Sequence, residues 1–114
     1  MIVLTVLKYL SVVVTLATGL ISIIWPKSIK GFTGLEASSP RAISEIRAVM
    51  GGVFVGLGVA AFILNTPDVY KMLGIGYAFI AAVRGVSIVV DRSTDRSNII
   101  SLVTEILLAL ILIW

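Results

Sequence analysis

The chain has 114 residues, room for one domain only, and 59% of them are hydrophobic while 13% are charged. Soluble domains average roughly 45–50% apolar residues and about 25% charged ones, and a domain this small exposes too much surface to hide the excess. The composition therefore predicts an integral membrane protein. The net charge of +3 is too small to indicate nucleic-acid binding.

The chain contains no Cys and no His. Their absence excludes disulfides, thiol redox chemistry, thiolate or imidazole metal sites and a Ser-His triad. No nucleophile motif or phosphate-binding loop replaces them. We therefore expect no cofactor, no metal site and no enzymatic activity.

Four apolar segments are each long enough to cross a hydrocarbon core of roughly 30 Å at about 1.5 Å per residue. We predict helices over about residues 2–25, 40–64, 67–90 and 97–114. The connections are short, so neighbouring helices should pair antiparallel. The predicted fold is all-α: a four-helix up-down bundle in the membrane, with residues 1–114 forming a single transmembrane domain.

The helix starts have local signals. The first segment could be a signal peptide, but no basic region precedes it and it is longer than a typical signal core, which favours a true helix. Ser39 is a predicted N-cap for the second helix, with Pro40 at the first helical position. Thr66 and Pro67 repeat that pattern for the third helix.

Basic residues predict the orientation. Loops 26–39 and 91–96 fall on one side of the membrane, and that side has the larger number of basic residues: Lys27, Lys30, Arg41, Arg92 and Arg96. The opposite side has Lys8 and Lys71. The positive-inside rule therefore places both loops in the cytoplasm and both termini outside, in the cell's inner membrane.

Small residues recur at four-residue intervals in the middle two helices. The stripes are Ala48, Gly52, Gly56 and Ala60 in the second helix and Gly74, Ala78 and Ala82 in the third. Such stripes let membrane helices approach closely and gain dispersion contacts. We interpret them as helix-packing faces, the alternative being a wall that lies against a flat ligand.

Two charges fall inside predicted membrane spans. Arg84 interrupts the third helix and Glu105 the fourth, each about 10 residues along the chain from the turn at 91–96. In an antiparallel hairpin the two side chains come level. Because a lone charge in hydrocarbon is costly, the sequence predicts that they pair. Asn98 falls on the Glu105 face and Ser87 on the Arg84 face.

The second helix adds Glu45 and Arg47 on the same predicted cytoplasmic side. All four charges could form a neutral network that only fixes helix register. They could equally form a site, with Glu105 carrying a proton or cation, or with Arg84 binding an anionic headgroup or substrate. Both interpretations stay open at the level of sequence.

The stretch from Glu45 to Gly52 has the pattern E-x-R-x-x-x-G-G. Together with Arg84 and Glu105, it resembles the hallmark of an uncharacterised prokaryotic membrane family, a domain of unknown function. The similarity covers nearly the whole chain. It implies a four-helix membrane bundle akin to DoxX-like proteins and no established activity.

The sequence favours a protein that binds or passes a small ligand, lipid or proton at its buried charges. Its expected partners are membrane lipid and further copies of the chain, because a bundle this small has little interior. The alternative is a non-catalytic accessory subunit of a larger membrane complex.

Overall fold

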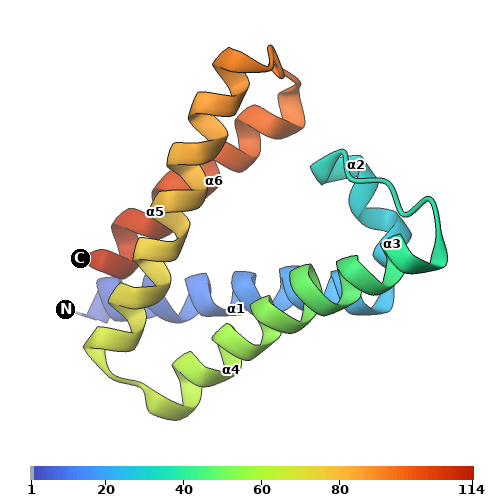
Figure 1. Cartoon of the computed structure of the whole chain (residues 1–114). Helices are drawn as coiled ribbons and strands as arrows, with labels where there is room; N and C mark the ends of the chain where they lie inside the picture. The colour runs from blue at the N-terminus through green and yellow to red at the C-terminus, as the bar shows by residue number, and fades with distance from the viewer. Residues whose placement is uncertain (1) are drawn as a thin grey trace. The chain divides into compact units, whose positions relative to one another are not determined.

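The computed structural model describes residues 2–114, which form helices joined by short connections (Figure 1). The elements in chain order are α1 (Ile2–Ile24), η1 (Pro26–Ile29), α2 (Lys30–Thr33), α3 (Pro40–Glu45), η2 (Ile46–Val53), α4 (Phe54–Leu64), α5 (Pro67–Val90) and α6 (Arg96–Ile113). Because α3, η2 and α4 follow one another without a break, they form one span. Four helices, 2–24, 40–64, 67–90 and 96–113, are long and apolar enough to cross a membrane.

The predicted start signals act differently at the two prolines. The Ser39 side chain accepts a hydrogen bond from the Ala42 backbone N–H at 3.0 Å, so Ser39 caps α3 as expected. Thr66 also stands at an N-cap position, but its hydroxyl makes no capping bond to α5. The Thr66–Pro67 signal therefore acts through the proline, whose φ is pre-set for a helix, and not through a Thr66 cap.

Residues 9–65 form one compact unit in which α1 runs antiparallel to η2 and α4. Gly19 of α1 lies against the backbone of η2 and α4. A Cβ atom at Gly19 would stand 2.8 Å from both the Gly51 oxygen and the Val55 nitrogen. Gly58 similarly accommodates Leu16. Glycine is required at position 19 because a side chain there would meet backbone atoms and separate the helices.

The close contact uses Gly51 and Gly58 rather than the predicted stripe. Gly51 and Gly58 are buried, whereas Gly52 and Gly56 are exposed, and a Cβ at Gly56 would meet no atom within 4 Å. Gly51 and Gly58 are seven residues apart, which is about two helical turns, so they share a helix face beside the predicted one.

The second compact unit comprises Thr66–Trp114 together with residues 2–8 of α1. Its main feature is the antiparallel α5–α6 hairpin (Figure 1). Gly74 of α5 packs against Leu112 and Ile113 of α6, where a Cβ atom would come within 3.0 Å of both residues. Gly74 therefore makes the close contact that its place in the predicted α5 stripe implies.

We predict opposite effects for two glycine-to-alanine substitutions. Gly19→Ala should destabilise the protein by about 1–3 kcal/mol, because the methyl group meets backbone atoms that cannot yield easily. Gly56→Ala should be neutral or stabilise by up to about 1 kcal/mol through helix propensity. Reversible denaturation in detergent micelles measures both. An equal loss at Gly56 would mean that the predicted stripe makes a contact outside its own unit.

Candidate functional site

Arg84 of α5 and Glu105 of α6 form a two-pronged ion pair across the hairpin. Arg84 Nε donates to Glu105 Oε1 at 2.7 Å, and Nη2 donates to Oε2 at 2.8 Å. A third bond runs from Arg84 Nη1 to Asn98 Oδ1 at 2.8 Å. This is the pairing that the similar distances from the turn predict, and it gives both carboxylate oxygens a donor.

The Asn98 side chain is fixed by the turn that precedes α6. Its Nδ2 donates to the Ser93 carbonyl at 2.9 Å and to Ser93 Oγ at 3.1 Å. Since a carbonyl can only accept, the amide nitrogen must face Ser93 and the amide oxygen must face Arg84. Arg92, with φ 54°, bends the chain so that Ser93 reaches this position. The turn therefore orients the guanidinium through Asn98.

The two charged partners differ in their accessibility. The Glu105 side chain is 12% exposed, whereas the Arg84 side chain is 30% exposed. Arg84 borders a pocket of about 530 Å³ whose other lining residues are Phe79, Ile80, Val83, Ser87 and Asn98. We call this the polar pocket. The guanidinium is the charged group that a molecule entering the polar pocket would meet.

Ser87 and Asp91 extend the polar surface towards the helix end. The Ser87 hydroxyl donates to Asp91 Oδ2 at 2.6 Å, one turn further along α5. Arg84 stands six residues before the end of α5, about 9 Å at the helical rise. The ion pair therefore lies inside the span, near enough to one end for polar groups to line the route between them.

Glu45 and Arg47, the other two predicted network residues, lie in the unit of residues 9–65. Glu45 pairs with Arg41, one helical turn away, and both side chains are largely exposed. Arg47 forms no ion pair with a described residue, and it lines a separate pocket with Pro40, Ile43 and Ser44 among others. A four-charge layer with Arg84 and Glu105 stays a prediction.

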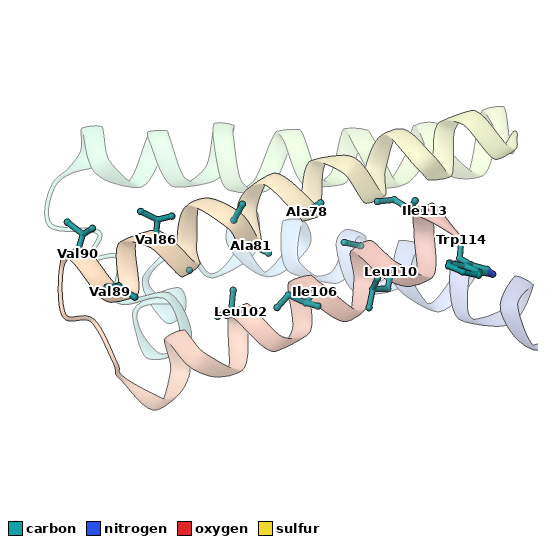
Figure 2. Close-up of a pocket in the computed structure, with 13 residues that line it drawn as sticks. Ala78, Ala81, Val86, Val89, Val90, Leu102, Ile106, Leu110, Ile113 and Trp114 are labelled. Carbon is teal, nitrogen blue, oxygen red and sulfur yellow. The ribbon is translucent and has the colours of Figure 1, made fainter.

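A second concavity, which we call the apolar groove, runs along the hairpin between α5 and α6 (Figure 2). It has a volume of about 970 Å³. The α5 side contributes small residues, among them Ala78 and Ala82 of the predicted stripe, and the α6 side contributes larger ones such as Leu102 and Ile106. The groove and the polar pocket share no lining residue.

No group of three or more Asp or Glu side chains suited to a metal ion occurs within residues 2–114. The donors and acceptors at Arg84 and Glu105 therefore define what the site can do chemically. It offers guanidinium N–H groups to an acceptor, in a pocket that Ser87, Asn98 and three apolar side chains also line. Asn98 is part of this site; the sequence placed it on the correct face but gave no indication of its bond to Arg84.

We predict that replacing one charge of the Arg84–Glu105 pair destabilises the protein more than replacing both. Glu105→Leu should destabilise the protein by roughly 2–3 kcal/mol because Arg84 is left without a counter-charge inside the span. The double variant Arg84→Leu/Glu105→Leu should recover most of that loss. Denaturation in micelles measures both, with Glu45→Leu as the control, since the exposed Arg41 pair contributes about 0.5 kcal/mol or less. A double variant less stable than Glu105→Leu would contradict this account.

Comparison with known proteins places the chain in a family without assigning it an activity. Residues 3–114 match the family model described as a domain of unknown function, DUF4345. No curated protein and no solved structure matches the chain. The likeness to DoxX-like proteins and the role of the E-x-R-x-x-x-G-G stretch stay predictions. Because the match spans nearly all of its length, the chain belongs to the DUF4345 family.

Proposed function

We propose that this protein is a multi-pass component of the cytoplasmic membrane that binds the polar end of a small amphiphile, a lipid or another membrane-dissolved molecule, at Arg84. The observation that carries the proposal is the unequal exposure of the ion pair: Glu105 is enclosed while Arg84 borders the polar pocket. A pair that only fixed helix register would gain from enclosing both charges, because each exposed donor in hydrocarbon lacks a partner.

Binding is favoured over proton carriage by the bonds that Glu105 makes. Both of its carboxylate oxygens accept hydrogen bonds from Arg84. A proton carrier must release its carboxylate in each cycle, which here would break a two-pronged bond and leave Arg84 uncompensated. The arrangement instead holds Glu105 still and uses it to orient the guanidinium.

The second candidate function is that of a non-catalytic subunit, in a larger complex or in a homo-oligomer. The apolar groove supports it, since small α5 residues in a concave surface suit the close approach of another membrane helix. The lining of the groove does not identify that helix. Ligand binding therefore remains the primary proposal, because it rests on specific polar contacts.

The ligand proposal predicts retention of an amphiphile that depends on Arg84 and Glu105. The protein is purified from membranes in a mild detergent, and bound lipids and small molecules are extracted and identified by mass spectrometry. We expect at least one species near one molecule per chain in the natural protein and at least a five-fold loss in Arg84→Leu/Glu105→Leu.

The matched control is Arg41→Leu/Glu45→Leu, which removes the exposed ion pair of the other unit. It should retain the same species as the natural protein. If all three proteins carry the same molecules in the same amounts, the Arg84 pocket does not bind them, and the subunit hypothesis takes precedence.

The orientation is tested separately. Loops 26–39 and 91–96 should be cytoplasmic and the carboxyl terminus external, because the basic residues cluster in and beside those loops. Alkaline phosphatase fused after Trp114 should therefore be active in a bacterial host, and green fluorescent protein fused there should stay dark. The reverse pattern would invert the topology while leaving the ligand proposal unaffected.

A further inference from the structure

The chemistry around Arg84 also restricts the class of ligand. Building on the proposed function, we infer that the polar pocket takes an electrically neutral amphiphile whose polar end presents an acceptor oxygen, such as an ester, ketone or amide carbonyl. Anionic and cationic headgroups are excluded. Three observations lead to this: the unused donors of Arg84, the committed hydrogen bonds of its neighbours, and the balance of charge in the hairpin.

The first observation is a count of donors. A guanidinium has five N–H groups and no acceptor. Three of the five are used, two by Glu105 and one by Asn98. One N–H on Nη1 and one on Nη2 therefore have no acceptor within residues 2–114. Since the available groups are donors on a cation, an ammonium or other cationic headgroup finds nothing to bind, and the ligand must supply an acceptor.

The second observation is that the other polar side chains lining the pocket have no free donor to offer a ligand. Asn98 is held with its oxygen towards Arg84 by the two bonds to Ser93. The Ser87 hydroxyl already donates its hydrogen to Asp91. Neither side chain has a free donor to stabilise a second or third oxygen of a phosphate or sulfate. The two free N–H groups of Arg84 are therefore the donors that the pocket offers, and a single carbonyl oxygen can accept from them.

The third observation is the balance of charge. The hairpin from residue 84 to residue 105 contains three arginines and three carboxylates: Arg84, Arg92, Arg96, Asp91, Asp95 and Glu105. The Glu105 carboxylate is in direct contact with the guanidinium that an anion would approach, so it repels that anion. In an apolar surrounding, a net negative centre is costly, whereas a neutral carbonyl introduces no charge. The neutral ligand is therefore favoured.

The rest of the pocket suits an apolar tail. Phe79, Ile80 and Val83 line it beside Arg84, and all three are exposed on the surface of α5. In a membrane that surface lies alongside lipid or another apolar partner. A tail attached to the bound carbonyl can leave the pocket over Phe79 and Val83 without crossing a polar group.

The test uses three probes with one chain length and different ends: methyl palmitate with a neutral ester carbonyl, hexadecyl sulfate with a permanent negative charge, and hexadecane with no acceptor. Each radiolabelled probe is partitioned at neutral pH between nanodiscs that contain the protein and empty ones, both made of ether-linked phosphatidylcholine, which has no carbonyl group to compete with the ester. We expect methyl palmitate to be enriched at least ten-fold more strongly than either of the other probes.

Variants separate binding at Arg84 from general partition. Arg84→Leu/Glu105→Leu should abolish the enrichment of methyl palmitate, and Arg41→Leu/Glu45→Leu should preserve it. Val83→Phe provides a second variant that leaves the ion pair intact and fills the pocket, so it should lower the enrichment at least five-fold in a protein with unchanged helical content.

The outcomes separate the two proposals. If hexadecyl sulfate is enriched as strongly as methyl palmitate or more so, and Val83→Phe removes that enrichment, the neutral-ligand inference is wrong while the proposed site stands. If all three probes are enriched equally, or if neither Val83→Phe nor the double variant changes the enrichment of any probe, the proposed site itself is wrong. Enrichment of methyl palmitate alone, lost in both variants, supports both.

Discussion

Hydrocarbon cannot solvate the guanidinium of Arg84, and the α5–α6 hairpin is arranged around that constraint. Glu105 supplies the counter-charge from the facing helix, and the two-pronged bond fixes the level at which the helices meet. The turn between the helices, besides joining them, positions Ser93 so that it can hold Asn98 against Arg84. Register, turn geometry and side-chain orientation thus depend on one charge.

Away from that charge, the helices gain little from hydrophobicity, since lipid is as apolar as the protein surface. Close approach has to supply the contacts instead. Gly19 against the backbone of Gly51 and Val55, and Gly74 against Leu112 and Ile113, are the places where this occurs. Each unit therefore has its own close backbone contact, and the hairpin adds the Arg84–Glu105 ion pair.

The features set by local chemistry could be predicted from the sequence. Pro40, Pro67 and the apolar runs define the spans, and similar distances from turn 91–96 place Arg84 near the level of Glu105. Choices between equally regular alternatives could not be predicted. Gly51 and Gly58 also recur at helical spacing beside the Gly52–Gly56 stripe, and they make the close contact with α1. Glu45 could have paired with a charge on another helix or with Arg41 one turn away, and the structure shows the Arg41 pair.

The two concavities of the hairpin allow both proposed functions to coexist. Arg84 faces the polar pocket, while Ala78, Ala82 and Leu102 line the apolar groove, and no residue belongs to both. A helix seated in the groove would therefore leave the residues of the pocket uncovered. It would also hold α5 against α6 from the apolar side, which protects the register on which the Arg84–Glu105 bond depends. Association along the groove would in that way support the pocket rather than compete with it.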